Sequence, residues 1–173
     1  MQNGKNNKVY LITGGAGFIG HKTANKLIEE GYAVRVFDNL SNQVHPDPKA
    51  SLSRLHSAVE FICGDVRDRI QLKAALEDID IVYHFAAETG VGQSMYEVAR
   101  YSDVTIQGTA VLCDCLAKGE NQVQKLILSS SRAVYGEGQY LCSRCKIVYP
   151  STRSISQLKK GICDLTCPQC GTK

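Results

Sequence analysis

The sequence predicts an α/β fold, a doubly wound parallel sheet of about five strands with helices on both faces. Short apolar runs without polar alternation recur along the chain, as is typical of strands that are buried on both faces. Helical patterns lie between these runs, and the connections are short, which favours right-handed crossovers between parallel strands. With 173 residues, 43% of them hydrophobic and 21% charged, the chain can build one such domain with a real core.

Five apolar runs are the expected strands. Each is rich in Val, Ile, Leu, Phe or Tyr, and each is followed by a small or polar residue. They cover residues 8–13, 33–38, 59–63, 79–85 and 125–128. Because ligands of open α/β sheets bind at the carboxyl ends of the strands, the residues that follow these runs are the first candidates for a site.

The first helix is predicted directly after the first strand and the glycines that follow it. Its apolar positions repeat at the spacing of one helix face, and Gly31 is placed to end it. These positions are Gly20, Ala24, Leu27 and Ile28. Residues 71–76 form a second, shorter helix candidate. The loop 41–50, which contains two prolines, is the long irregular stretch expected in this part of the chain.

The third helix is predicted over residues 94–118, with Gly119 as its stop. It carries two apolar stripes, and such a helix packs on the sheet with one stripe and on something else with the other. Two occupants fit the second stripe equally well. One is a partner subunit, which would make the protein a homodimer through this helix, and the other is a further part of the same chain.

A glycine-rich turn joins the first strand to the first helix. Its sequence is Thr13-Gly14-Gly15-Ala16-Gly17-Phe18-Ile19-Gly20. Gly14 allows a tight turn, Gly17 lets the backbone approach a pyrophosphate, and Gly20 lets the helix lie against the sheet. The helix start at Phe18 and Ile19 then offers free N–H groups and a partial positive charge to the phosphates. In this position, between a strand and an amphipathic helix, the glycines predict a dinucleotide-binding loop of the Rossmann type.

Asp38 ends the second strand and is followed by Asn39. A carboxylate at this place accepts hydrogen bonds from the hydroxyls of the adenosine ribose and repels a 2′-phosphate. Arg35 lies inside the strand, in the wrong place to clamp such a phosphate. NAD is therefore favoured over NADP as the cofactor, with capping of the following loop as the alternative role of Asp38.

Three other strand ends carry small or polar residues. Asp65 and Val66 follow the third strand, where Asp65 could accept a hydrogen bond from the adenine amino group. The fourth strand ends in Phe85-Ala86-Ala87, whose alanines would give a smooth floor for a flat ring or a pyrophosphate, and Ser129 follows the fifth. Ordinary turns are the alternative, but their shared edge of the sheet favours cofactor contacts.

A composition shift predicts a boundary between a body, residues 1–141, and a tail, residues 142–173. The tail has six basic residues and one acidic residue, whereas the body has 14 basic and 16 acidic residues. The net charge of +3 is too small to argue for a polyanionic partner by itself. Five of the eight cysteines lie in the tail. The other three sit in apolar segments and are expected to be small buried hydrophobes: Cys63, Cys113 and Cys115.

Two Cys-x-x-Cys pairs in the tail predict a structural zinc site in a small zinc-ribbon-like segment. The ligands would be Cys142, Cys145, Cys167 and Cys170. Four thiolates surround Zn²⁺ tetrahedrally at ~2.3 Å and leave no open position for catalysis. Disulfides are the less favoured use of the cluster because no export signal is recognised. Cys163 is the spare thiol of the tail.

The sequence argues against a membrane protein. No stretch approaches the ~18 uninterrupted apolar residues of a membrane span. Residues 1–8 are polar, so neither a signal peptide nor an anchor is expected, and the cytoplasm is the default compartment. The basic tail raises a nucleic-acid-binding module as a second hypothesis, but its single aromatic residue, Tyr149, provides no stacking platform.

Seven motifs stand in order along residues 8–141. They are the glycine loop, Asp38-Asn39-Leu40, Gly64-Asp65-Val66-Arg67, His84-Phe85-Ala86-Ala87, Val91-Gly92-Gln93-Ser94, Gly108-Thr109 and Ser129-Ser130-Ser131-Arg132-Ala133-Val134-Tyr135-Gly136. Together they resemble the extended short-chain dehydrogenase/reductase family, the NAD-dependent sugar-nucleotide epimerases and dehydratases. Within it, Gln43-Val44-His45 and Gly92-Gln93-Ser94-Met95-Tyr96-Glu97 are similar to the dTDP-L-rhamnose 4-epimerase-like and UDP-glucose 4-epimerase-like members.

This resemblance implies an enzyme in which NAD takes a hydride from a carbon of a UDP- or dTDP-linked sugar. A Tyr in a Tyr-x-x-x-Lys motif would remove the hydroxyl proton, and the Lys would lower the pKa of that tyrosine. Ser131 occupies the position of the family's Ser or Thr that hydrogen-bonds the same hydroxyl. The alternative for Ser131 is a strand-end serine that satisfies only backbone groups.

The sequence departs from the family pattern in two ways. No Tyr is followed four residues later by Lys, since Tyr149 has Arg153 and Tyr135 has Gln139 at that spacing, and the family's helix asparagine is Thr105 here. The resemblance therefore implies that the Tyr-Lys helix and the substrate domain lie beyond these 173 residues, which are expected to be inactive alone. A non-catalytic, regulatory NAD-binding protein stays open as an alternative.

Overall fold

The computed structural model describes residues 8–119 and 121–173. The chain divides into two compact units, one that ends at Ser129 and one that runs from Ser130 to Lys173. The second unit therefore begins before the composition shift near residue 141. No helix in the described part of the chain is long and apolar enough to cross a membrane.

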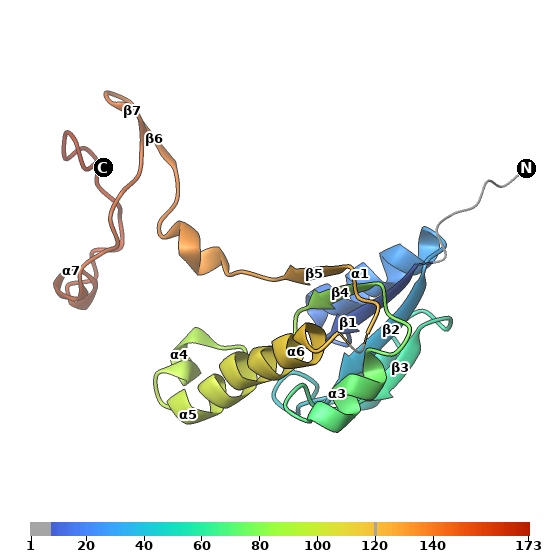
Figure 1. Ribbon diagram of the computed structural model, residues 1–173. Helices are drawn as coiled ribbons and strands as arrows, with labels where there is room; N and C mark the ends of the chain where they lie inside the picture. The colour runs from blue at the N-terminus through green and yellow to red at the C-terminus, as the bar shows by residue number, and fades with distance from the viewer. Residues whose placement is uncertain (1–7, 120) are drawn as a thin grey trace, which may run out of the picture. The chain divides into compact units, whose positions relative to one another are not determined.

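A parallel sheet of five strands forms the centre of the first unit, as predicted (Figure 1). The strands are β1 (Val9–Thr13), β2 (Ala33–Asp38), β3 (Glu60–Cys63), β4 (Ile81–His84) and β5 (Lys125–Leu128). Their order is β3-β2-β1-β4-β5, and every neighbouring pair is parallel. The chain builds the sheet outward from β1 in one direction and then in the other. The carboxyl edge between β1 and β4 is therefore the topological switch point at which such sheets bind ligands.

Helices cover both faces of this sheet because successive strand residues point to opposite sides. On one face, Leu11 and Phe37 belong to a buried cluster with residues of α3 (Arg69–Ala75) and of α6 (Gly108–Ala117). On the other face, Tyr10 and Ile12 belong to a second cluster that includes Ala24 of α1 (Phe18–Glu29). The doubly wound arrangement of the prediction is thus confirmed.

The helix predicted over residues 94–118 begins later and is not uniform. A short helix α4 (Val91–Ser94) comes first, and the chain leaves helical geometry at Glu97. Helix α5 (Val98–Tyr101), a π-helical stretch η1 (Ser102–Gln107) and α6 then follow without interruption. The start at residue 94 was wrong because the break is held by polar side-chain contacts, which an apolar repeat does not report. In the predicted loop 41–50, residues from Pro48 onward form α2 (Pro48–Leu52), capped by the Asp47 side chain.

The second unit contains little regular structure. A 3₁₀ turn η2 (Arg132–Tyr135) is followed by an antiparallel hairpin of β6 (Tyr140–Cys142) and β7 (Lys146–Val148), and then by α7 (Ile155–Lys159). Within this unit, Arg153 pairs with Glu137 at 2.9 Å and donates to the Cys163 carbonyl, which ties the segment after β7 to the segment before β6.

Candidate functional site

The glycine loop lies at the carboxyl end of β1 and is packed tightly. Gly14 has a φ of 66°, and a Cβ there would lie 2.7 Å from the backbone nitrogen of Ala86 at the end of β4. At Gly20 a Cβ would lie 2.4 Å from the Gly14 carbonyl oxygen. Side chains are therefore excluded at both positions. Gly20 allows α1 to contact the backbone of the loop itself, which makes its role more local than the predicted contact with the sheet.

The first turn of α1 matches the requirements of a phosphate site. Gly17 is its N-cap and brings no side-chain acceptor, and no acidic residue lies in the first turn. Phe18 and Ile19 are largely exposed, at 77% and 64%. Sequence reasoning missed Gly15, where a Cβ would lie 2.6 Å from a Val36 methyl carbon, because the glycine spacing alone does not report a contact with the next strand.

Asp38 is buried beside the glycine loop. Its Oδ2 accepts the backbone N–H of Ala16 at 3.0 Å, and its Oδ1 accepts that of Leu40 at 2.9 Å. His45, also buried, places Nε2 3.5 Å from Oδ1. Asp38 therefore both caps the following loop, as the alternative interpretation held, and presents its carboxylate at the predicted edge. The partner His45 was missed because a loop residue seven positions away gives no local signal.

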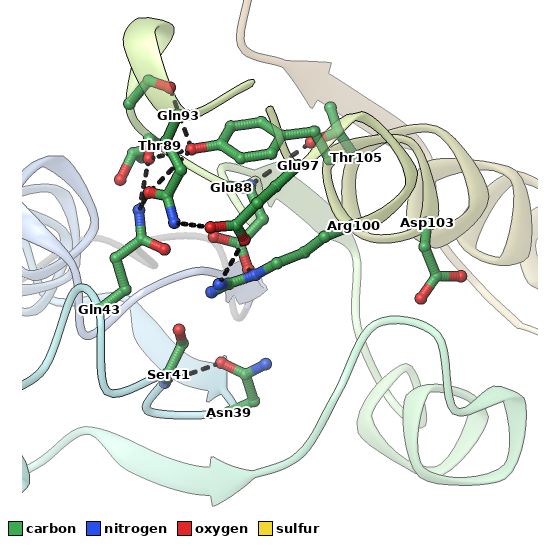
Figure 2. Close-up of polar contacts among 12 residues, drawn as sticks. Asn39, Ser41, Gln43, Glu88, Thr89, Gln93, Glu97, Arg100, Asp103 and Thr105 are labelled. Carbon is green, nitrogen blue, oxygen red and sulfur yellow. Dashed lines mark hydrogen bonds and ion pairs between the residues drawn. The ribbon is translucent and has the colours of Figure 1, made fainter. Parts of the chain in front are cut away.

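Asn39 and Asp65 are joined to each other at the same edge. Asn39 Nδ2 donates to Asp65 Oδ2 at 3.0 Å. Asn39 Oδ1 accepts from the Ser41 backbone N–H (Figure 2). Asp65 also accepts three hydrogen bonds from the backbone and guanidinium of Arg67. These bonds hold the pKa of the Asp65 carboxyl well below its usual range. Since a carboxylate has about four acceptor positions, Asp65 is saturated without an adenine amino group.

A directional chain of hydrogen bonds connects the ends of β1 and β4. Thr109 donates to a backbone carbonyl, so its oxygen accepts from His84 Nε2 at 3.0 Å. His84 Nδ1 must then accept from the Thr13 hydroxyl at 2.7 Å, and Thr13 Oγ1 accepts from the Ala86 N–H at 3.3 Å. Burial lowers the pKa of His84 to about 4, which keeps the ring neutral near pH 7. This series of hydrogen bonds fixes the position of the Ala86 backbone at the end of β4.

The other predicted cofactor residues differ in how they face this edge. Val66 is buried in the core, 2.6 Å from where a Cβ of Gly108 would lie, so only its backbone is available at the edge. Phe85 packs on Tyr83, with ring centroids 5.6 Å apart, and Ala87 is exposed. Ser129 is tied to the end of β4, because its hydroxyl donates to the His84 carbonyl at 3.2 Å.

Ser131 belongs to the second unit and caps η2 by accepting the Ala133 N–H at 3.1 Å. This is the backbone role that the sequence offered as its alternative, and the hydroxyl proton can still donate elsewhere. Tyr135 and Tyr149 are mostly exposed, and Tyr149 donates to the Gln139 side chain at 3.3 Å. The catalytic role of Ser131 stays a prediction.

The four predicted metal ligands come together in the second unit. The Sγ atoms of Cys142, Cys145, Cys167 and Cys170 all lie within 4.8 Å of one another. Tetrahedral Zn–S bonds of ~2.3 Å place the sulfurs ~3.8 Å apart, and the Cys142–Cys170 separation is 3.6 Å, far longer than a disulfide. Cys142 ends β6 and Cys145 lies in the turn that leads to β7, whose first residue, Lys146, has a φ of 63°.

Hydrogen bonds in this cluster shift the pKa values of two of its thiols in opposite directions. A hydrogen bond to Cys170 raises the pKa of the Cys145 thiol to about 12, and hydrogen bonds with Thr172 lower the pKa of Cys170 to about 6. The lowered pKa of Cys170 favours the thiolate, the form of cysteine that binds metals. Outside the cluster, Cys115 is buried as expected, but Cys63 and Cys113 are exposed, and their predicted burial was wrong. Cys63 ends an outer strand, and the apolar sequence around it does not report that exposure.

The chain is similar to a known protein family and to several known proteins. The model of the NAD dependent epimerase/dehydratase family matches residues 10–154. The chain belongs to this family. It is 40% identical over 154 residues to the dTDP-L-rhamnose 4-epimerase of Burkholderia thailandensis, covering 88% of this chain and 42% of that protein. It is 34% identical over 169 residues to the UDP-glucose 4-epimerase of Drosophila melanogaster, covering 88% and 48%.

Solved structures of family members superpose on the chain. The UDP-glucose 4-epimerase of Bifidobacterium longum, in complex with NAD+ and UDP, is 36% identical with a TM-score of 0.64, covering 75% of this chain and 38% of that one. The Thermotoga maritima enzyme with UDP-glucose gives the same identity and TM-score, covering 75% and 40%. The chain thus spans less than half the length of these relatives, and it matches their NAD-dependent family as the sequence motifs predicted.

Proposed function

We propose that this chain is the NAD-binding part of a nucleotide-sugar epimerase or dehydratase. The observation that carries the proposal is the meeting of the glycine loop, Asp38 and Ala86 at the carboxyl edge of the sheet, at its switch point. The relative from Bifidobacterium longum was solved with NAD+ bound, which supports the same cofactor here.

The cofactor would extend along this edge from β2 to β4. Its pyrophosphate would lie against Gly17 and the uncapped first turn of α1, where backbone N–H groups and the helix dipole favour an anion. Asp38 already accepts two backbone N–H groups, which leaves acceptor capacity for the adenosine ribose. Val66 would contact the cofactor through its backbone. Ala86 and Ala87 would contact it through their methyl groups.

The cofactor preference is tested by calorimetric titration of the chain with NAD and with NADP. We expect tighter binding of NAD, because the buried Asp38 carboxylate repels a 2′-phosphate. Asp38→Asn removes the charge but keeps only one of the two oxygens that accept the Ala16 and Leu40 N–H groups. Overall affinity should therefore fall for both cofactors, and the preference for NAD over NADP should narrow at least about tenfold. Equal or tighter binding of NADP by the unmodified chain would contradict the proposed preference for NAD.

We further propose that the 173 residues alone do not turn over a UDP- or dTDP-sugar. A tyrosine with an ordinary pKa near 10 is a poor base at neutral pH unless a cation lowers that pKa, and no Tyr in the sequence has the family's Lys. Ser131 can orient a hydroxyl but cannot hold its proton. Turnover of a nucleotide sugar with NAD that is abolished by Tyr149→Phe would contradict this proposal.

The cysteine cluster is proposed to hold one structural zinc ion. The mutual distances of its four sulfurs and their Cys-x-x-Cys spacing support tetrahedral coordination with no open position. A nucleic-acid role gains no support from this unit, because Arg153 and Lys173, two of its basic residues, are paired with Glu137 and Asp164. A gel-shift assay that showed salt-dependent binding of RNA or DNA would favour that alternative.

We propose that a second copy of the chain packs on the second apolar stripe of the long helix. The residues of this stripe are exposed, which supports an unfilled contact: Ala99, Ile106, Ala110, Cys113 and Ala117. Sedimentation equilibrium tests the idea, since Ile106→Lys should shift a dimer toward monomer. A chain that is monomeric before the substitution would leave the other occupant, a further part of the same polypeptide.

A further inference from the structure

Two loops approach each other across the glycine loop. The sheet order places β1 between β2 and β4, so the loops that follow β2 and β4 flank the turn that follows β1. A bond between the two flanking loops therefore crosses the path along which a dinucleotide would run from Asp38 toward Ala86. Gln43 lies in the loop after β2, whereas Thr89 and Gln93 lie in the segment after β4 (Figure 2).

The Gln43 side chain makes this crossing. Its Nε2 donates to the Thr89 carbonyl at 2.7 Å and to Gln93 Oε1 at 2.6 Å, across 46 and 50 positions of sequence. Gln43 is exposed, so the two bonds can exchange with water at little cost, unlike the buried bonds of Asp38. They can open and close while the sheet and both loops keep their fold.

The segment after β4 is organised to receive Gln43. Gln93 Nε2 donates to Glu97 at 2.6 Å, and a carboxylate can only accept, so the amide oxygen of Gln93 must face Gln43. Arg100 then holds Glu97 at 3.0 Å and Glu88 at 3.1 Å. The orientation of the receiving amide is thus fixed by a chain of charged neighbours (Figure 2).

Gly90 lies at the centre of these contacts. Its φ of 116° is a conformation that side chains rarely adopt, and a Cβ there would lie 3.0 Å from the Tyr101 hydroxyl. The same Cβ would lie 3.7 Å from Gln43 Nε2. Tyr101 in turn donates to the Thr89 carbonyl at 2.7 Å, the same oxygen that accepts from Gln43. Backbone and side chains therefore converge on one acceptor.

We propose that Gln43, Thr89 and Gln93 form a clasp that closes over the bound dinucleotide and controls its release. The clasp rests on the proposed function, since it needs a dinucleotide on the glycine loop. Gln43 acts as a positioning residue that joins its own loop to the segment after β4. Glu97 and Arg100 keep the Gln93 side-chain amide oriented. Release of the cofactor then requires the Gln43 bonds to break.

The test compares dissociation of the fluorescent NAD analogue 1,N6-etheno-NAD from the unmodified chain, Gln43→Ala and Gln43→Glu, by stopped-flow displacement with excess NAD. Gln43→Ala should speed dissociation about tenfold and association by less. Gln43→Glu should speed it more, because a carboxylate would face the two acceptor oxygens of Thr89 and Gln93. Gln107→Ala, an exposed glutamine of η1, is the matched control and should leave both rates unchanged.

The thermal midpoint of the cofactor-free chain separates a clasp from a merely structural contact, because loss of two exposed bonds should leave it within about 2 °C. Dissociation rates that are unchanged in both Gln43 variants overturn the clasp and leave NAD binding intact. A large drop in the thermal midpoint with unchanged dissociation also overturns it. An unmodified chain that does not bind the analogue or NAD overturns the proposed function and the clasp with it.

Discussion

The two units of the chain are stabilised in different ways. The sheet unit holds two clusters of buried side chains, one on each face, among them Leu11, Phe37 and Leu72. In residues 130–173, all of which the structure describes, Val148 and Cys167 are the buried apolar side chains. Most of the larger apolar residues there are exposed, including Leu141, Tyr149 and Ile155. The second unit therefore has no extended hydrophobic core of its own.

This difference indicates what each unit needs in order to fold. A segment of this size cannot bury enough surface by itself, and such segments usually depend on a metal or on disulfides. The zinc ion that we propose for the four cysteines would supply this support, since zinc binding and folding are coupled when the site forms only in the folded state. The sheet unit, by contrast, has strands and helices that bury both faces of the sheet.

The largest expected effect is the loss of metal from the second unit. Cys167→Ser, or a chelator, should remove about one equivalent of zinc and abolish amide protection in residues 130–173, because binding worth on the order of 10 kcal/mol is lost. The sheet unit should keep its protection. Hydrogen exchange followed by mass spectrometry, with metal analysis, measures both.

Cys163→Ser is the matched control for that substitution, since Cys163 is exposed and lies outside the cluster. It should leave the zinc content and the protection of residues 130–173 unchanged. Metal-free protein that keeps full protection in the second unit would contradict the comparison, as would a disulfide between members of the two Cys pairs.

A smaller effect is expected in the sheet unit from Gly20→Ala. The new Cβ would meet the Gly14 carbonyl oxygen at 2.4 Å, so the glycine loop or α1 must shift, at a cost of about 3 kcal/mol. The thermal midpoint of unfolding of the sheet unit should fall by several degrees, and the affinity for NAD should fall with it. Gly92→Ala is the control, because nothing lies within 4 Å of its Cβ and it sits in the short helix α4. Equal effects of the two substitutions would refute this account.

The sequence predicted the sheet well because its signals are local. Apolar runs, the glycines at Gly14, Gly17 and Gly20, and the stop at Gly31 each act within a few residues of the element that they define. The observed strands lie within the predicted ones, and the parallel order follows from the crossover rules. The π-helical stretch around Thr105 could not be predicted, since Thr105 accepts from the Glu88 backbone 17 positions away. The break at Glu97 was missed because its near neighbours Gln93 and Arg100 are polar and do not show in an apolar repeat.

The candidate site was predictable in its residue types but not in its pairing. The spacing of the Cys pairs predicted a cluster that the structure assembles. By contrast, the partner of Asp38 is His45, the lone pairs of Asp65 are taken by Arg67, and Gln43 reaches Gln93 across 50 positions. Such contacts depend on how loops fold over the sheet, and no periodic pattern encodes them.

Acid pH sharpens the comparison further, because the sheet unit contains a buried titratable group at its centre. His84 bonds Thr13 and Thr109 and has no charged partner among these contacts, so burial alone lowers its pKa from 6.5 to about 4. Because the pKa of His84 is lower in the folded chain than in the unfolded chain, the folded chain has its full stability at pH values above the unfolded pKa of 6.5. That stability is lost as the pH falls from about 6.5 toward 4, since the unfolded chain binds the proton first.

The stability of the sheet unit should therefore fall by roughly 2–3 kcal/mol across this window through His84 alone. Denaturant unfolding at several pH values measures it. His84→Gln should be less stable at pH 7 but should lose this part of the pH dependence, whereas His56→Gln, at an exposed histidine, should keep it. In the protonated ring Nδ1 donates, so the bond to Thr13 would reverse its direction and the Thr13 hydroxyl hydrogen would need another acceptor. A pH profile that is the same in His84→Gln and in the unmodified chain would show that the neutral ring is not what couples β1 to β4.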